Sequence, residues 1–207
     1  MIYSLKYFAL FLPLVLLEAK GCVTSHQKNL NAGEYIKWVE NPENGLFVTK
    51  PVSDYVFTLQ YKPLPYVVMQ DEKRPMKKKE MQDKMASFSD MQYYTFRIGT
   101  VSGKDVQRFN IDNDQQFYAR LEYFSLTMQN DIKLIDNGDT LPCLMYSFER
   151  TYGIDPRATF VLAFNKSKKP EATKTLLYSD QVLGTGPILL SVSANDLQQI
   201  PELSLPE

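Results

Sequence analysis

Alternation between large apolar side chains and polar ones is the pattern that most restricts the fold of this chain. In the segment 54–61, every second residue from Tyr55 onward is aromatic or aliphatic. Because successive side chains of a strand point to opposite faces of a sheet, this segment predicts a strand with one face in the core. The same period returns in three further segments, 94–98, 117–123 and 144–148.

Other apolar runs predict more strands. At 160–164, Val161 and Ala163 separate three larger apolar side chains, a pattern typical of a central strand that is covered on both faces. Shorter runs predict five further strands, at 35–39, 66–69, 132–135, 174–179 and 188–192. About ten short strands are therefore expected, as in an all-β domain.

The segments between these runs contain residues that form turns at low energetic cost, for example Asn41–Gly45, Asp136–Asp139 and Gly184–Pro187. We read the last of these as a hairpin turn rather than a phosphate-binding loop, because a strand pattern and not a helix follows it. The sequence thus predicts a mainly β fold, an antiparallel β-sandwich that is immunoglobulin-like or transthyretin-like.

One stretch, at 71–90, interrupts the strand pattern with mixed charges. Its large apolar residues recur at gaps of five, four and three, as Met76, Met81, Met85 and Phe88. This spacing predicts one short amphipathic helix inserted in the sandwich, with Pro75 near its first turn. We interpret it as a solvated helix in a connection. The alternative is a cationic face at Lys77–Lys79 that lies near anionic lipid head groups.

The amino terminus has the order of a secretory signal. One lysine precedes an apolar run at Tyr7–Leu17. The small residues Ala19 and Gly21 then come just before Cys22. The apolar run is too short to cross a bilayer, which takes roughly 20 helical residues. We therefore predict a signal peptide at residues 1–21 that is removed by cleavage before Cys22.

This segment resembles the signal peptide of bacterial lipoproteins, in which the first residue after the cut is a cysteine that receives diacylglycerol through its sulfur. The resemblance covers Met1–Cys22 and does not extend to the rest of the chain. It implies lipidation at Cys22 and attachment to a membrane through that lipid. The alternative is an ordinary secretory signal that is cut at the same bond and releases a soluble protein.

The organisation that follows is a lipidated tether at 22–33, which is polar and lacks a hydrophobic period, and a single β-sandwich domain at 34–207 with its helical insertion around 71–90. The resemblance implies a place in the bacterial cell envelope. No acidic run follows Cys22 of the kind that some bacteria read as a mark for export to the cell surface. This favours the outer membrane, on its periplasmic face.

Catalytic and metal sites are not predicted, and neither is a cofactor. The only histidine, His26, falls in the predicted tether, which excludes histidine-dependent nucleophilic catalysis and the usual zinc sites. Glu122 and Glu149 lie on strand patterns opposite the aromatic face and are predicted to be solvated rather than paired across a cleft. Asp112–Asp114 and Asp136–Asp139 offer oxygen ligands but do not match a calcium loop, and turn chemistry explains both.

The second of the two cysteines, Cys143, lies in the apolar stretch Leu141–Tyr146. It is predicted to be a buried, unreactive thiol. A disulfide between Cys22 and Cys143 is the alternative.

The predicted lipid anchor, tether and β-sandwich domain come without a recognisable set of catalytic residues. Together they favour a non-enzymatic cell-envelope lipoprotein that binds another envelope protein or organises an assembly. A formal net charge of −1 gives no reason to expect binding to nucleic acid. The second hypothesis is a surface glycan-binding module, in which exposed aromatic rings such as Trp38 stack on sugar faces.

Overall fold

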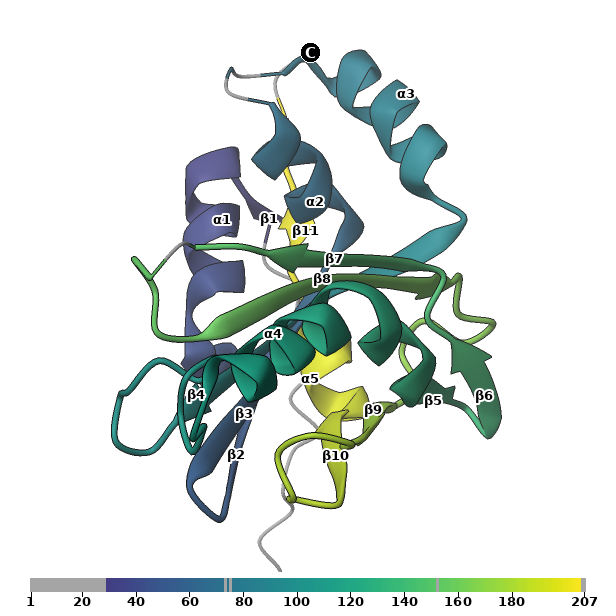
Figure 1. The fold of residues 1–207 in the computed structure, drawn as a ribbon. Coiled ribbons are helices and arrows are strands. Elements are labelled where there is room, and N and C mark those ends of the chain that lie inside the picture. Colours follow the sequence, from purple (N-terminus) through teal and green to yellow (C-terminus); the bar gives the residue numbers. More distant parts are fainter. Residues whose placement is uncertain (1–28, 73, 75, 152, 206–207) are drawn as a thin grey trace, which may run out of the picture.

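Two antiparallel sheets form the centre of the fold in the computed structural model, which describes residues 29–72, 74, 76–151 and 153–205 (Figure 1). The first sheet has the order β2-β3-β4-β8-β7 and the second has the order β10-β9-β5-β6. The strands of the first sheet are β2 (Phe47–Val52), β3 (Tyr55–Lys62), β4 (Met91–Thr100), β8 (Ala158–Asn165) and β7 (Met145–Glu149). Those of the second are β10 (Pro187–Val192), β9 (Lys174–Ser179), β5 (Ile132–Asp136) and β6 (Asp139–Pro142).

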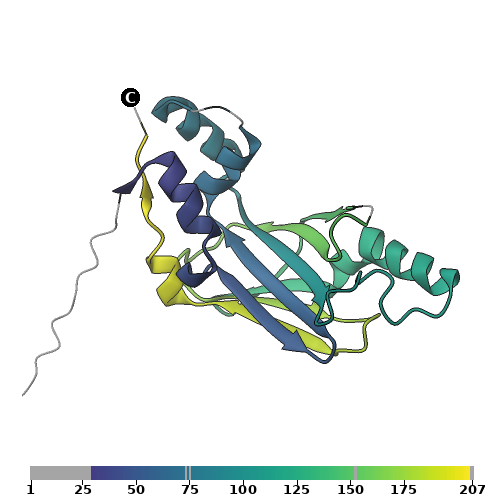
Figure 2. The same cartoon turned by 90° about the vertical axis from the view of Figure 1, so that its left-hand side faces the viewer.

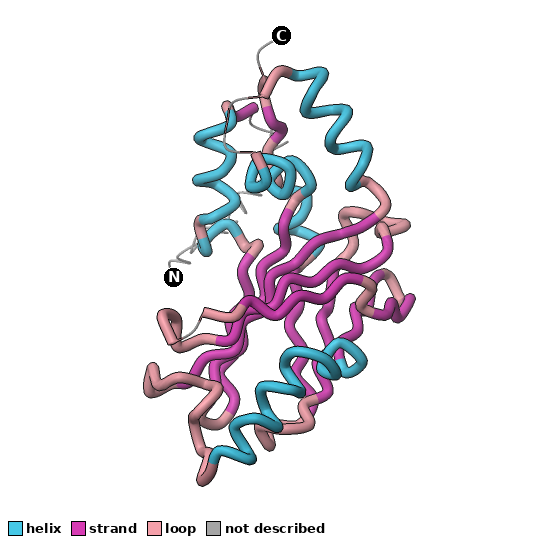
Figure 3. The backbone as a smooth tube through the Cα atoms, turned by 45° about the horizontal axis from the view of Figure 1, so that its top comes forward, coloured by secondary structure: helices cyan, strands magenta, loops and turns pink. Residues whose placement is uncertain are grey.

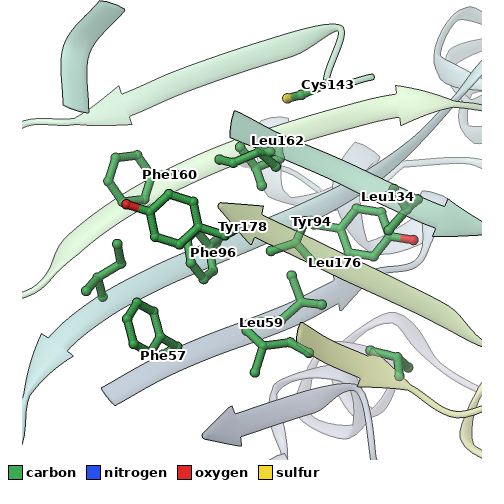
Figure 4. Packing of buried hydrophobic residues seen from close by; sticks show 14 of the residues in the cluster. Phe57, Leu59, Tyr94, Phe96, Leu134, Cys143, Phe160, Leu162, Leu176 and Tyr178 are labelled. Atoms are coloured by element: carbon green, nitrogen blue, oxygen red, sulfur yellow. The ribbon is translucent and has the colours of Figure 1, made fainter. Parts of the chain in front are cut away.

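The core lies between the inner faces of these two sheets. Phe57 and Phe96 from the first sheet face Tyr178 from the second, with ring centroids 6.3 and 5.6 Å from that of Tyr178 (Figure 4). All three side chains are buried, and the aromatic pairs adopt the tilted arrangements that such rings favour. The prediction of an antiparallel, mainly β sandwich is confirmed.

Seven of the ten predicted strands are present, at 54–61, 94–98, 132–135, 144–148, 160–164, 174–179 and 188–192. Both faces of β8 are covered as predicted, since Ala163 is buried and Val161 is half-buried. The Gly184–Pro187 segment joins β9 to β10 as a hairpin, and the carboxylate of Asp180 holds this loop by accepting hydrogen bonds from the backbone N–H groups of Val182, Leu183 and Thr185.

Three predicted strands are helices instead. Residues 35–39 belong to α1 (Ala32–Glu40), residues 66–69 to α2 (Leu64–Asp71), and residues 117–123 to α4 (Asp114–Glu122) and the π-turn η2 (Tyr123–Thr127) that follows. The short 3₁₀ segments η1 (Pro42–Asn44) and η3 (Met128–Asp131) and the helix α5 (Ala194–Gln198) complete the helical part. Helix is therefore not confined to one insertion.

Hydrogen bonds at the helix caps explain why α1 and α4 form helices where alternating apolar residues predicted strands. The Asn31 side chain accepts a hydrogen bond from the Glu34 N–H at 3.0 Å, and the Glu34 carboxylate accepts one from the Asn31 N–H at 3.3 Å. This capping box starts α1, whose buried residues Tyr35 and Val39 are four positions apart and share one helix face. Asn113 caps α4 in a similar way, by accepting from the Gln116 N–H.

The predicted helix of the 71–90 stretch is present as α3 (Lys78–Phe88), in which Met81 is buried. Pro75 lies outside the described residues. Within the described part of the chain, no helix is long and apolar enough to cross a membrane.

A layer that we call the cap lies at one end of the first sheet. It consists of α1, α2, α3 and a two-stranded parallel ribbon of β1 (Asn29–Leu30) and β11 (Glu202–Leu203) (Figures 1 and 2). The tether prediction is therefore wrong at 29–33, because these residues form β1 and begin α1. α4 lies on the opposite side of the sheets from the cap (Figure 3).

Candidate functional site

A groove in the cap, with a volume of about 670 Å³, lies between β11 and α3. It is within the size range of ligand-binding clefts. Its walls are mostly apolar, with Leu64, Pro65, Met81, Met85, Ile200, Pro201, Leu203 and Leu205 among the lining residues. Polar groups, including Lys78, Gln82 and Glu202, also line it. We call this hollow the cap groove.

Two of the four α3 residues that line the cap groove are methionines, Met81 and Met85. Met76 and Met81 are buried with Val68, and Met85, Met69 and Leu203 pack against this cluster half-buried. Unbranched thioether side chains change rotamer at low cost and fill irregular spaces. This wall can therefore adapt to apolar side chains of different shapes.

One wall of the cap groove is a strand with a single paired edge. Among the described strands, β11 pairs with β1 alone, in parallel register that places Leu30 opposite Leu203. The Ser204 N–H donates to the Leu30 carbonyl at 2.8 Å, so this edge of β11 is used. Because backbone polar groups alternate along a strand, the N–H and C=O of Leu203 point to the other side. That edge is available for pairing with an extended chain.

A second hollow of about 440 Å³ lies beside the first, and both are lined by Ser204 and Leu205. Its other lining residues include Ile36 from α1, Met69 from α2 and Met76. The carboxyl-terminal segment after β11 thus has apolar hollows on two sides.

Tyrosines at the base of the cap groove are neutral hydrogen-bonding groups. Burial, together with the nearby Asp136 carboxylate, raises the pKa of Tyr61 to about 12. Burial also raises the pKa of Tyr35 well above its ordinary value. Neither phenol can act as a base near neutral pH.

Trp38, the candidate sugar platform, does not line the cap groove, whereas Met81 and Met85 of the predicted helix do. Trp38 lies in α1, where it is half-buried, packs against the main core and accepts a hydrogen bond on its carbonyl from Asn44. Cys22 and His26 lie outside the described residues. Glu149 is exposed near the end of β7, and Glu122 is exposed at the end of α4 rather than on a strand.

Cys143 is buried, as predicted, and its thiol lies 3.1 Å from the Met145 carbonyl, to which it donates. Burial raises the pKa of the Cys143 thiol to about 12. The thiolate is therefore scarce near neutral pH, as expected of an unreactive cysteine.

The two acidic turns have structural roles. In the 112–114 segment, Asn113 caps α4. In the 136–139 turn, Asp136 is buried and accepts a hydrogen bond from Lys174 Nζ at 2.6 Å and another from Gln92 Nε2 at 2.9 Å. Sequence reasoning missed this buried ion pair. Among the described residues, no group of three or more histidine, cysteine or acidic side chains gathers as a metal site would require.

Comparison of the chain with protein-family models, with curated proteins and with solved structures finds no match.

Proposed function

We propose that this protein is a non-enzymatic lipoprotein of the bacterial cell envelope, that Cys22 carries its lipid, and that it binds an extended apolar segment of a partner protein in the cap groove. The observation that carries the binding role is the combination of an adaptable methionine wall with a strand that has one open edge. Strand addition uses this combination, because backbone hydrogen bonds supply affinity and side-chain hollows supply specificity.

The size and composition of the cap groove support a peptide as its occupant. Side chains of an added strand alternate between two faces, and hollows of about 670 and 440 Å³ adjoin the β11 segment. Polar residues such as Gln82 and Glu202 line the larger hollow, where they can meet the polar groups of a bound backbone.

The position of the cap also fits a partner in the membrane or close to it. β1 begins at Asn29, seven positions after Cys22. A fully extended chain spans at most about 3.6 Å per residue, so this connection reaches about 25 Å. A lipid on Cys22 would therefore keep the cap near the bilayer surface, and we propose the periplasmic face of the outer membrane as its location.

Replacing Met85 with aspartate should weaken peptide binding by about tenfold or more, because an apolar wall of the cap groove would then carry a charge that a bound segment must desolvate. Peptides with alternating apolar residues would be selected from a random display library against residues 29–205, and their affinities measured by calorimetry. Methylating every second backbone nitrogen of a selected peptide should also abolish binding. This loss is expected for the set of nitrogens that faces β11 and not for the other set.

Ser87→Asp is the matched control, because it introduces the same side chain on the same helix at an exposed position that does not line the cap groove. It should leave the affinity unchanged. Equal losses in the two variants, or selected peptides that bind equally well with either set of nitrogens methylated, would contradict binding by strand addition in this groove.

A further inference from the structure

The outer face of the first sheet, which points away from the core, carries a polar row across all five strands. Cross-strand partners place five side chains in this row, in the order Thr49, Thr58, Arg97, Thr159 and Glu149. Arg97 stands at its middle, on the central strand β4. A solvated sheet face commonly carries polar residues, but a half-buried guanidinium at its centre needs a partner.

Arg97 lacks such a partner within the described residues, where no oxygen accepts a hydrogen bond from its guanidinium. Burial lowers the pKa of Arg97, and the neighbouring Arg157 lowers it further. The carboxylates of Glu149 and Asp155 act in the opposite direction and raise this pKa. Arg97 is thus a partly desolvated cation whose donors remain free.

A hollow of about 290 Å³ opens beside Arg97. We call it the cationic pocket, and its lining residues are Val56, Thr58, Arg97, Gly99, Thr100, Gly103, Lys104, Pro156 and Arg157. Three of these side chains are cations, and none is an acid. Asp155 lies nearby, but it is occupied by Arg157, which donates to its two oxygens at 3.0 and 2.9 Å.

Gly99 allows the two arginines to approach each other. A Cβ atom at position 99 would lie 3.2 Å from Cγ of Arg157, closer than most such contacts. Without it, the Arg157 stem lies across β4 next to Arg97, which is two residues earlier on the same face of the strand. Two guanidinium groups side by side repel each other, and the Asp155 carboxylate bound to Arg157 offsets part of this repulsion.

We propose that the cationic pocket binds an acidic saccharide, through a carboxylate or phosphate group that accepts hydrogen bonds from Arg97 and from Nη1 of Arg157, which Asp155 leaves free. Guanidinium groups recognise planar or tetrahedral oxyanions through paired hydrogen bonds. Lys104 adds a third positive charge, and the hydroxyl of Thr58 can meet sugar hydroxyls.

The place of the cationic pocket in the fold favours a saccharide over the lipid head groups of the anchoring membrane. β4 begins at Met91, just after α3 of the cap, and runs away from the cap to Thr100 beside the pocket. The β2–β3 hairpin at this end lies far from β1 in both views (Figures 1 and 2). This step rests on the proposed anchor at Cys22, which would place the cap and not the pocket at the bilayer.

Titration of residues 29–205 with an oligogalacturonate tests the proposal. Binding should be detectable by calorimetry, should weaken with added salt, and should be absent for the neutral galactose oligomer of equal length. Arg97→Met should reduce the affinity about tenfold or more, because a charge-assisted pair of hydrogen bonds is lost. Arg157→Met should do the same, and its exposed position means that folding is preserved.

Lys133→Met is the matched control, since it removes one charge from an exposed position on β5 of the other sheet. Equal affinity for the acidic and neutral oligomers, or equal losses for Arg97→Met and Lys133→Met, would overturn the proposal. Saturable binding to anionic vesicles without binding to the uronate would overturn it as well, in favour of a lipid head group. Absence of peptide binding in the cap groove would leave these measurements unaffected.

Discussion

Replacing Lys174 with methionine is expected to lower the free energy of unfolding by about 3–5 kcal/mol. The side chains of Lys174 and Asp136 are 1% and 3% exposed, and they face each other at 2.6 Å. Removing the cation leaves the Asp136 carboxylate buried without its counter-charge, which is the costly way to break such a pair. Urea denaturation of the two proteins, followed by circular dichroism, measures the difference.

A second lysine provides the control. Lys168 pairs with Asp139 at 2.7 Å, but these side chains are 80% and 50% exposed. Solvent screens such a pair, so Lys168→Met should change the free energy of unfolding much less than Lys174→Met does. Both variants lose one ion pair of similar length, so burial is the main difference between them. Equal effects would mean that the Asp136–Lys174 pair does not contribute through its burial.

The same pair predicts a pH dependence. Burial tends to raise the pKa of Asp136, but hydrogen bonds from Lys174, Gln92 and Ser167 outweigh it and hold this pKa below its ordinary value. A carboxylate whose pKa is lower in the folded state stabilises the fold above its unfolded pKa of about 3.9. This stabilisation is lost as the pH falls through the folded pKa. The stability difference between wild type and Lys174→Met should therefore shrink in acid.

The strands that the sequence predicted correctly are those in which alternation coincides with burial by a facing sheet. In β3, for example, Tyr55, Phe57 and Leu59 are buried and the residues between them are half-buried. Alternation failed at 35–39 because apolar residues four apart also fit a helix face. The capping box of Asn31 and Glu34 is the local signal that distinguishes the two.

The strand prediction for residues 117–123 was wrong for another reason. There Arg120, which the strand pattern placed on the solvent face, is buried and donates to the carbonyls of Val106 and Phe109 at 2.9 and 2.6 Å. These acceptors lie in an irregular segment with no sequence period of its own. A buried, satisfied arginine in such a helix cannot be read from hydrophobicity alone.

The candidate sites depended on contacts between distant parts of the chain. Methionine spacing predicted α3, yet the cap groove exists only because β11, from the other end of the described chain, lies beside that helix. Likewise, Asp136 and Lys174 are 38 positions apart, and each alone suggests a solvated turn or strand end. The sequence defines the local elements, whereas the pairing of sheets determines which polar groups meet.

Replacing Cys22 with serine should transfer the protein almost entirely from the membrane pellet to the soluble fraction. A diacylglycerol on this sulfur would supply two acyl chains, and each buried methylene contributes about 0.8 kcal/mol to membrane attachment. A serine hydroxyl accepts no such thioether-linked lipid, so the anchor is lost. Fractionation of whole cells with detection of the protein in each fraction provides the measurement.

The second cysteine makes the matched control for this prediction. Cys143 is buried in the folded body, so Cys143→Ser should leave the protein in the membrane fraction with its lipid in place. Intact mass of the membrane-extracted wild type should correspond to a chain that begins at Cys22 plus its acyl groups. A mass without acyl groups, with release of the wild type into the soluble fraction, would instead indicate an ordinary secretory signal. A Cys22→Ser protein that still pellets with lipid would contradict the anchor at Cys22.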